Sequence, residues 1–347
     1  MPRQHPNFTG MKALYCITPG EFEYKETAVP QPLEAQTLLK IKRIGICGTD
    51  LHAFEGTQPF FQYPRILGHE LAAEIAATGA PGFSAGDPVT FIPYFHCGHC
   101  IACRMQKTNC CVNMQVCGVH VDGGMREYLV VPDHSLIRGE GLSPDELALV
   151  EPLAIGAHGI RRAAVLPEEF VLVVGAGPIG LGTLEFARIA GARVIAMDVN
   201  AMRLDFCRNK LGIHHAVNPA TSSAIQQLQD ITRGDMPTVV IDCTGNLSAI
   251  NGAFQYLAHG GRYVLIGLQR GEIGFNHPEF HKREATLMSS RNAVRADFEH
   301  VISSMKRGWV NPTNYITHQT NFDSIKADFG SWLDPANGVI KAMVEMT

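Results

Sequence analysis

The chain has 347 residues, 29 of them basic and 33 acidic, which gives a formal net charge of −4. Hydrophobic residues make up 46% and charged residues 18%, a balance typical of a globular protein with enough apolar material for two domains. This composition excludes a disordered chain, and the lack of a basic excess argues against binding to nucleic-acid phosphates. The sequence contains no run of about eighteen apolar residues, so we expect no membrane-spanning segment.

The first ten residues lack the apolar core of a secretory signal. We therefore expect a cytoplasmic protein. Its ten cysteines should then be free thiols in a reducing compartment.

Short segments of β character dominate residues 11–150. Glycine, proline and aspartate separate them, as turns between strands usually do. The expected strands include residues 12–17, 38–42, 89–92 and 128–131. This texture predicts a mostly antiparallel β domain.

Potential metal ligands are scattered through this half of the chain. Cys47 lies in a Gly-Ile-Cys-Gly-Thr-Asp segment, His69 and Glu70 are adjacent, and Glu151 opens a Glu-Pro-Leu-Ala segment. Each alone is an ordinary buried or helix-start residue. Together they supply a thiolate, an imidazole and carboxylates, a mixed set that can leave one position of Zn²⁺ open for water or substrate.

A second potential metal site has the spacing C-x2-C-x2-C-x7-C. Thiols this close cannot all pair in relaxed disulfides. Four thiolates would fill a tetrahedral Zn²⁺ and leave no place for substrate, so we predict a structural zinc site. Its ligands are Cys97, Cys100, Cys103 and Cys111. The neighbouring Cys110 competes for the fourth position, and the spacing favours Cys111.

From about residue 170, short apolar strands alternate with stretches long enough for one helix. The expected strands are residues 171–174, 194–197, 215–217, 238–242, 262–266 and 285–288. Such alternation predicts an α/β class domain with a doubly wound parallel sheet. The last fifty or so residues lose this rhythm and could return to the first domain.

A glycine motif of the form G-x-G-x-x-G follows the first of these strands. Gly175 permits a tight turn, Gly177 lets a pyrophosphate approach the backbone, and Gly180 lets the helix pack closely on the strand. The second strand ends in Asp198, whose carboxylate would bind the adenosine ribose hydroxyls and repel the 2′-phosphate of NADP. We therefore predict NAD as the cofactor. Arg203 either lies against the adenine or is a solvated helix residue.

Taken together, the motifs G-I-C-G-T-D-x-H, G-H-E, the cysteine cluster and V-x-G-A-G-P-I-G resemble the zinc-dependent medium-chain alcohol dehydrogenase family. The polyol branch of that family includes sorbitol, xylitol and threonine dehydrogenases. The resemblance implies a GroES-like catalytic domain over residues 11–152, a Rossmann domain over 153–293 and a segment 294–347 that returns to the first domain. It also implies a cleft between the domains and a homo-oligomer, either a tetramer or a dimer.

The resemblance further implies two zinc ions per subunit, one structural and one catalytic. Cys47, His69 and Glu70 would be catalytic ligands. Glu151 stands where other members have a cysteine, and it would bind zinc directly or through water. Asp50 would orient one of the ligands, His69 or Cys47, without touching the metal itself.

The implied reaction transfers a hydride from an alcohol carbon to nicotinamide, after zinc has lowered the pKa of the alcohol hydroxyl. Thr49 matches a proton-relay hydroxyl, and His52 matches the imidazole at the far end of the relay. Packing and surface roles are the alternatives for these two residues. The residues that would contact NAD are Gly175, Gly177, Pro178, Ile179, Gly180, Asp198, Arg203, Thr244, Ile266, Gly267 and Leu268.

Residues 118–120, 280–284 and 289–292 resemble aldonate dehydrogenases of the L-galactonate 5-dehydrogenase type, which implies a polyol or a sugar acid as the substrate. A carboxylate would favour a cationic partner, for which Arg291 and then Lys282 are candidates, and His120 is a candidate hydroxyl contact. L-threonine 3-dehydrogenase and sorbitol or xylitol dehydrogenase activities are the alternatives. A protein that senses NAD without turnover is the alternative outside enzymes.

Overall fold

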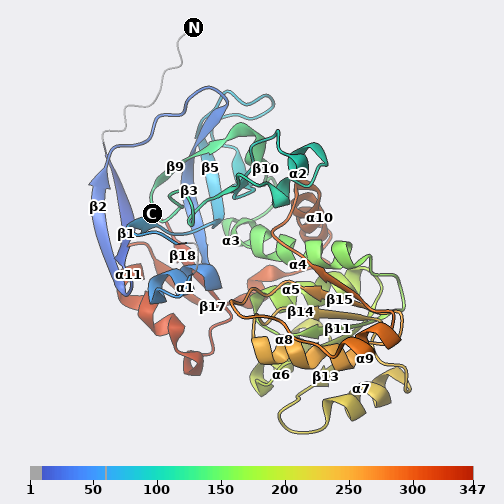
Figure 1. The fold of residues 1–347 in the computed structure, drawn as a ribbon. Coiled ribbons are helices and arrows are strands. Elements are labelled where there is room, and N and C mark those ends of the chain that lie inside the picture. The colour runs from blue at the N-terminus through green and yellow to red at the C-terminus, as the bar shows by residue number, and fades with distance from the viewer. Residues whose placement is uncertain (1–9, 59–60, 347) are drawn as a thin grey trace. The chain divides into compact units, whose positions relative to one another are not determined.

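The computed structural model describes residues 10–58 and 61–346, and the chain divides into two units. Unit 1 comprises residues 1–151 and 294–347, and unit 2 comprises residues 152–293. Figure 1 shows the elements of both units. None of the described helices is long and apolar enough to cross a membrane.

The main sheet of unit 1 is built around strand β3, which pairs antiparallel with β5, β9 and β18. The described part of this sheet follows the order β10-β6-β5-β3-β18-β17, with β9 paired to β3 off that path. Its strands are β3 (Gln36–Ile46), β5 (Glu70–Ala77), β6 (Pro88–Phe91), β9 (Tyr128–Pro132), β10 (Leu136–Arg138), β17 (Ile316–Asn321) and β18 (Lys341–Glu345). The pairing of β18 with β3 joins the end of the chain to its first part.

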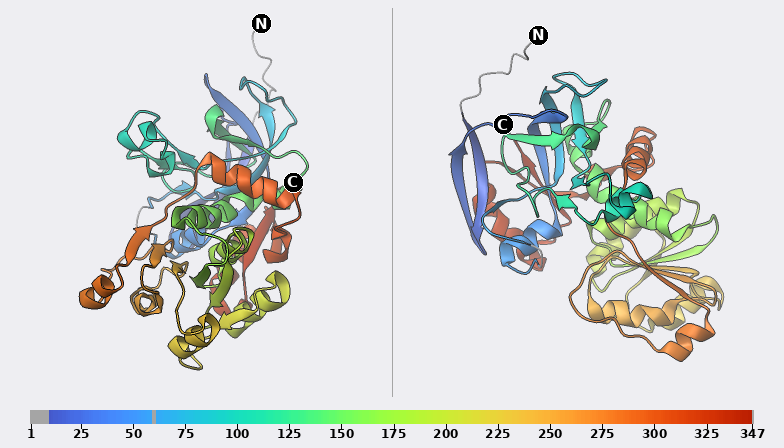
Figure 2. Two further views of the ribbon diagram at one scale, coloured as in Figure 1. Left: turned by 90° about the vertical axis from the view of Figure 1, so that its right-hand side faces the viewer. Right: turned by 45° about the horizontal axis from the view of Figure 1, so that its top comes forward.

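Smaller elements complete unit 1. A second sheet has the order β2-β1-β4, and β7 pairs with β8. These strands are β1 (Met11–Thr18), β2 (Glu21–Thr27), β4 (Arg65–Ile66), β7 (Tyr94–Phe95) and β8 (Gln115–Val116). The helices are α1 (Gly48–Glu55), α2 (Ile101–Arg104), α3 (Pro144–Ala148), α10 (Arg295–Lys306) and α11 (Ile325–Asp328), while α4 (Val150–Ala163) begins in unit 1 and continues into unit 2. A lobe that contains α2 projects from unit 1 (Figure 2).

Unit 2 is a parallel sheet in the order β13-β12-β11-β14-β15-β16, which is the doubly wound order expected from the sequence. Helices lie on both faces of this sheet (Figures 1 and 2). The strands are β11 (Phe170–Val174), β12 (Arg193–Met197), β13 (His215–Val217), β14 (Val239–Asp242), β15 (Arg262–Leu265) and β16 (Thr286–Ser289). The helices are α5 (Pro178–Ile189), α6 (Ala201–Leu211), α7 (Ala224–Thr232), α8 (Leu247–Ala253) and α9 (His277–Lys282).

The inner strands of unit 2 are apolar along their whole length because helices cover both faces of a parallel sheet. All four residues of β14 are buried, and Leu172, Ile195 and Val240 belong to one apolar cluster. The predicted strands match the observed ones to within one residue at either end. The predicted α/β class and the parallel sheet are therefore confirmed.

Candidate functional site

The lobe of unit 1 brings four cysteine sulfurs together. The Sγ atoms of Cys97, Cys100, Cys103 and Cys111 all lie within 4.8 Å of one another. The Cys100–Cys103 and Cys97–Cys111 pairs are both 3.5 Å apart, and the Cys100–Cys111 pair is 3.9 Å apart. Four sulfurs at about 2.3 Å from a tetrahedral Zn²⁺ would be separated by such distances, so the residues fit the metal.

The backbone of the lobe favours the thiolate form of two of these ligands. N–H groups of His99 and Cys100 donate to the Cys97 sulfur and lower its pKa to about 6. The pKa of Cys100 is lowered in the same way by the N–H groups of Cys103 and Val112. A metal ligand must be a thiolate, so these donors suit the site to a cation.

Cys110 and Cys111 provide a direct test of the ligand assignment. Cys110 is exposed, whereas Cys111 is buried with the other three sulfurs. We expect Cys111→Ser to lower the zinc content by one ion per chain and to destabilise the lobe. Cys110→Ser should leave both unchanged. Metal analysis and thermal unfolding of the two variants check this, and equal zinc loss in both would contradict it.

A second group of buried polar side chains comes from α1, the start of β5 and the start of α4. The carboxylate of Asp50 is 1% exposed and accepts hydrogen bonds from the N–H groups of Cys47 at 2.9 Å and Gly68 at 3.0 Å. Its Oδ1 also lies 3.8 Å from Nδ1 of His69. Asp50 therefore joins the segment that carries Cys47 to the segment that carries His69.

His69 occupies a strongly negative, dry environment. Burial lowers its pKa, but the charges of Asp50, Cys47 and Glu151 raise it well above the ordinary value, and a hydrogen bond with Cys47 adds to this effect. Its Nδ1 is buried and has no hydrogen-bond partner among the described residues. A ring that faces a carboxylate on one side and a thiolate on the other is arranged as a cation ligand would be.

Glu151 belongs to the same group. It is 4% exposed at the start of α4, and its carboxylate accepts a hydrogen bond from the hydroxyl of Tyr94. Burial raises the pKa of Glu151 to about 7, while the charge of His69 lowers it and that of Glu70 raises it. Cys47, His69 and Glu151 offer the sulfur, nitrogen and oxygen donors that Zn²⁺ accepts. Within the described part of the chain, the four lobe cysteines are the only group of three or more such side chains whose ligand atoms are close enough together to hold a metal ion without movement.

Glu70 has a buried partner that the sequence did not indicate. Both of its carboxylate oxygens accept hydrogen bonds from the ammonium group of Lys341 at 2.6 Å. Glu70 is fully buried, Lys341 is 2% exposed, and the ammonium also donates to the carbonyl of Ile46 at 3.0 Å. A β-carbon on Gly45 would lie 2.3 Å from Oε2 of Glu70, so only glycine fits opposite this carboxylate. Glu70 is therefore the counter-ion of Lys341 in this structure, and its role as a zinc ligand stays a prediction.

Lys341 is not among the residues that the sequence motifs single out. Burial lowers its pKa, but the carboxylate of Glu70 raises it above the ordinary value, so the group stays charged. The signal available in the sequence was a lysine next to the apolar run of the last strand. That signal did not reveal its partner.

The two predicted relay residues lie on α1. Thr49 is half-buried near the start of the helix. The side chain of His52 is 63% exposed, and its Nδ1 lies 3.2 Å from the Thr57 hydroxyl and 3.3 Å from the Glu55 carboxylate. An exposed imidazole exchanges protons with water readily, which suits the outer end of a relay.

In unit 2 the glycine motif forms the turn from β11 to α5. Gly175 has φ +97°, which disfavours other residues, and α5 begins with Gly177 at its N-cap and Pro178 at its first position. A β-carbon on Gly180 would lie 1.7 Å from the carbonyl oxygen of Gly175. Thr244 lies directly against this turn, because a β-carbon on Gly175 would be 2.8 Å from its Cγ2. The turn thus leaves backbone N–H groups at the start of a helix, the usual position for a pyrophosphate.

Asp198 lies at the end of β12, beside this turn. Its Oδ2 accepts from the N–H of Ala176 at 2.7 Å and its Oδ1 from that of Asn200 at 2.8 Å. A carboxylate oxygen has two lone pairs, so each oxygen can still accept a hydroxyl. Arg203 has its Nη1 3.8 Å from Oδ2 of Asp198.

The loop after β15 lies beside the same turn. The N–H groups of Ile266 and Gly267 both donate to the carbonyl of Asp242, and the side chain of Leu268 is 72% exposed. The structure therefore gathers the predicted dinucleotide contacts around the carboxyl ends of β11, β12, β14 and β15.

The predicted substrate residues are divided between the units, with His120 in unit 1 and Lys282 and Arg291 in unit 2. His120 accepts a hydrogen bond at Nδ1 from the N–H of Val116, so this nitrogen supports a turn. Lys282 is exposed on α9, with its Nζ 3.7 Å from Glu279. Arg291 is exposed shortly after β16.

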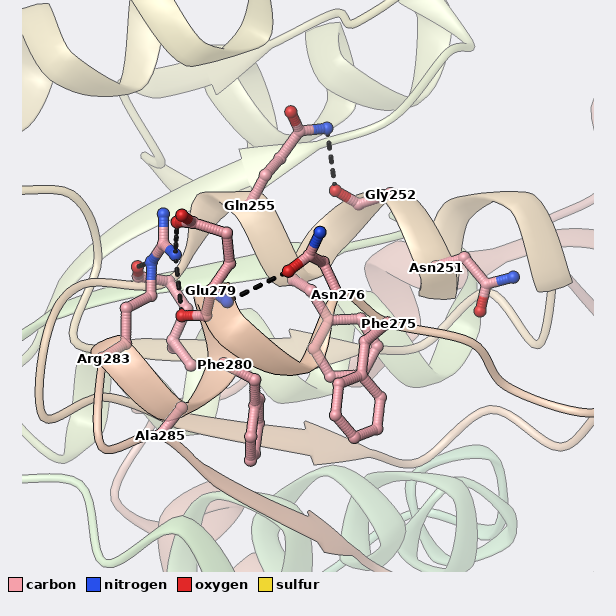
Figure 3. A pocket seen from close by; sticks show the side chains of 11 residues that line it. Asn251, Gly252, Gln255, Phe275, Asn276, Glu279, Phe280, Arg283 and Ala285 are labelled. Carbon is pink, nitrogen blue, oxygen red and sulfur yellow. Dashed lines mark hydrogen bonds and ion pairs between the residues drawn. The ribbon is translucent and has the colours of Figure 1, made fainter.

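Helix α9 also lines a pocket of unit 2 with a volume of about 230 Å³. Phe254, Phe275 and Phe280 form its aromatic side, while the ion pair of Glu279 with Arg283 lies at its edge (Figure 3). The glycine motif and Asp198 are not among its lining residues. This pocket is therefore separate from the dinucleotide residues.

Comparison with known proteins identifies the class to which this fold and site belong. Residues 34–141 match the alcohol dehydrogenase GroES-like domain, and residues 178–307 match the zinc-binding dehydrogenase family. The chain is 43% identical over 317 residues to L-galactonate-5-dehydrogenase of Escherichia coli strain K12, which covers 91% of this chain and 93% of that protein.

Two solved structures are similar over almost the whole chain. The first is the alcohol dehydrogenase RspB of Escherichia coli CFT073 in complex with NADH, with a TM-score of 0.89, 28% identity and coverage of 97% of this chain and 100% of that one. The second is a zinc-binding dehydrogenase of Sinorhizobium meliloti 1021 bound to NADP, with a TM-score of 0.89, 26% identity and the same coverage.

These matches define an oxidoreductase with a GroES-like domain and a Rossmann domain. More narrowly, the chain belongs to the zinc-dependent medium-chain alcohol dehydrogenase family, in its polyol branch. The predictions of the family, the fold and an enzymatic activity are confirmed.

Proposed function

We propose that this protein oxidises a secondary alcohol of a sugar acid or polyol to a ketone with NAD, at a zinc ion held by unit 1. The observation that carries this proposal is the group formed by the half-buried Cys47 and the buried His69 and Glu151. The buried carboxylate of Asp50 accepts a hydrogen bond from the N–H of Cys47 and so supports this group. The similarity to L-galactonate-5-dehydrogenase supports an aldonate as the substrate.

Zinc at this site would act as a Lewis acid that lowers the pKa of the substrate hydroxyl. Cys47, His69 and Glu151 would hold it, with Glu70 beside them as the partner of Lys341. Asp50, whose Oδ1 lies 3.8 Å from Nδ1 of His69, would help to orient the ring. Thr49 and the exposed His52 would pass the released proton to water, and the alcohol carbon would give its hydride to the nicotinamide.

The test is a substrate screen read by NADH absorbance at 340 nm. L-galactonate, sorbitol, xylitol and L-threonine are supplied in turn with NAD⁺ and then with NADP⁺. We expect the highest kcat/KM with L-galactonate and NAD⁺. Preference for L-threonine or for the neutral polyols would assign one of the alternative activities. Binding of NADH without turnover of any of these alcohols would favour an NAD sensor.

Asp198 is proposed to set the cofactor preference. In Asp198→Ala the carboxylate that would repel a 2′-phosphate is absent, so we expect kcat/KM for NADP⁺ to rise and that for NAD⁺ to fall, each by about tenfold. Asp205→Ala, which removes an exposed carboxylate of the same helix region, is the matched control. If NADP⁺ use in Asp198→Ala stays as low as in the unaltered enzyme, another residue selects the cofactor.

We also propose a homo-oligomer, most simply a tetramer, with two zinc ions per chain. Light scattering of the purified protein and metal analysis measure both numbers.

A further inference from the structure

Unit 1 contains a cavity of about 300 Å³ whose lining includes none of the proposed zinc or dinucleotide residues. Its walls come from segments far apart in the sequence: the stretch after β6, the cysteine lobe, the turn before β10, and the start of α10. The polar lining of the cavity includes His96, Gln106, His134 and Arg295. The size is at the lower end of the range for small-molecule sites, about 300–1,000 Å³.

The polar groups on these walls are cationic or neutral. The rings of His96 and His134 lie 4.6 Å apart between centroids, and Arg295 supplies a permanent charge. No described lining residue is an aspartate or a glutamate. Four carboxylates of the described residues lie close to these walls. The charge of Asp133 acts on His134, and Glu299 lies 3.7 Å from Nη1 of Arg295. Glu151 accepts a hydrogen bond from Tyr94, and Asp297 accepts one from the N–H of Val294.

Arg295 is held in a fixed position. Its Nη2 donates to the carbonyls of His134 at 2.8 Å and Leu136 at 3.1 Å. Burial lowers the pKa of His134, and the charges of His96 and Arg295 lower it further. An anion bound between His134 and Arg295 would offset the unfavourable interaction between these two groups.

Two further observations point to a missing acceptor. Nδ1 of His96 is buried and has no hydrogen-bond partner among the described residues, a state that proteins usually avoid. In addition, α10 is 12 residues long and begins at this cavity with Val294 at its N-cap, where the N–H of Val294 donates to the buried carboxylate of Asp297 at 2.9 Å. Helix N-termini attract anions through their free N–H groups and the helix dipole.

We propose that this cavity binds a small oxyanion, the carboxylate or phosphate group of a ligand, with Arg295 and the two imidazoles as its donors. The donor set matches the chemistry of such a group, because guanidinium and imidazole N–H groups form short charge-assisted hydrogen bonds to anionic oxygens. Tyr94 lines the same cavity and also donates to Glu151, so an occupant would lie next to a proposed zinc ligand. The oxyanion can therefore be a free anion or the carboxylate of a sugar-acid substrate.

Calorimetric titration of the zinc-loaded protein tests this proposal with inorganic phosphate, L-galactonate and the uncharged galactitol. Arg295→Gln removes the permanent charge, and we expect it to weaken oxyanion binding at least about tenfold. Because Arg295 also supports β10, a second variant is needed. Gln106→Glu places a negative charge on the exposed part of the wall and should weaken binding similarly, whereas Gln319→Glu makes the same change on β17, away from the cavity, and should not.

The outcomes separate the two sources of the oxyanion. If phosphate binds and both Arg295→Gln and Gln106→Glu weaken its binding, the cavity is a site for a free anion. Weakening confined to L-galactonate, with a raised KM for it and an unchanged KM for sorbitol in Gln106→Glu, indicates the substrate carboxylate. Phosphate and L-galactonate affinities that are the same in Gln106→Glu, Gln319→Glu and the unaltered protein would overturn the proposal, even if the enzyme is active.

Discussion

Cys47→Ala is expected to lower kcat/KM by more than about 100-fold while NADH still binds to unit 2. Removing a residue that hydrogen-bonds to a metal ligand typically lowers metal affinity or activity by roughly 10- to 100-fold. Removing the ligand itself should lower them further. The residue also lies at the N-cap of α1, where its N–H binds Asp50, and alanine preserves that backbone bond. Steady-state kinetics and NADH fluorescence titration measure the two effects separately.

The matched control is Cys16→Ala. Cys16 is a fully buried thiol of the same unit, in β1, and it has no place in the proposed site. We expect this variant to keep its turnover and its full zinc content. Normal turnover in Cys47→Ala, or equal losses in both variants, would remove Cys47 from the catalytic assignment.

Lys341→Met is expected to reduce the free energy of unfolding by about 3–5 kcal/mol, because it leaves the carboxylate of Glu70 buried without a counter-ion. Both side chains are almost completely inaccessible, and the ammonium group makes all three of its short contacts within the buried site. Replacing both partners, as in Lys341→Met with Glu70→Gln, should restore much of the loss, since neither charge then remains buried alone. Urea unfolding of the single and double variants gives the coupling between them.

Lys42→Met is the control for this experiment. Lys42 lies on β3, its side chain is 30% exposed, and its ammonium is 3.8 Å from Glu74. Exposed pairs of this kind contribute about 0–1 kcal/mol, so the variant should be nearly as stable as the unaltered protein. A loss of less than about 1 kcal/mol in Lys341→Met would show that Glu70 finds another partner or becomes protonated.

The local parts of the site could be predicted from the sequence. The four lobe cysteines lie within fifteen residues, so the short loops between them leave few arrangements other than a common centre. The same holds for the glycine turn, because the close contacts that exclude larger side chains there are made mainly between elements that are neighbours in the sequence. The boundaries of the parallel strands followed from apolar runs separated by helix-length stretches.

The nonlocal parts could not be predicted in this way. Glu70 and Lys341 are 271 residues apart in sequence, and they meet because β18 and β5 flank the same strand, β3. No local pattern specifies that register, so nothing in the sequence marks Lys341 as the partner of Glu70. The cavity lined by His96, His134 and Arg295 was missed for the same reason.

The sequence by itself determined the kind of chemistry, since a tetrathiolate lobe, a dinucleotide turn and a mixed set of metal ligands each require particular residue types at particular spacings. The tertiary structure decided which of those groups are free and which are already paired. Buried charges interact most strongly with the groups that folding places within a few ångströms of them, because the interior is dry and the interaction energy falls with distance. For Glu70 and for Arg295, the strand pairings and helix placements of unit 1 make that selection.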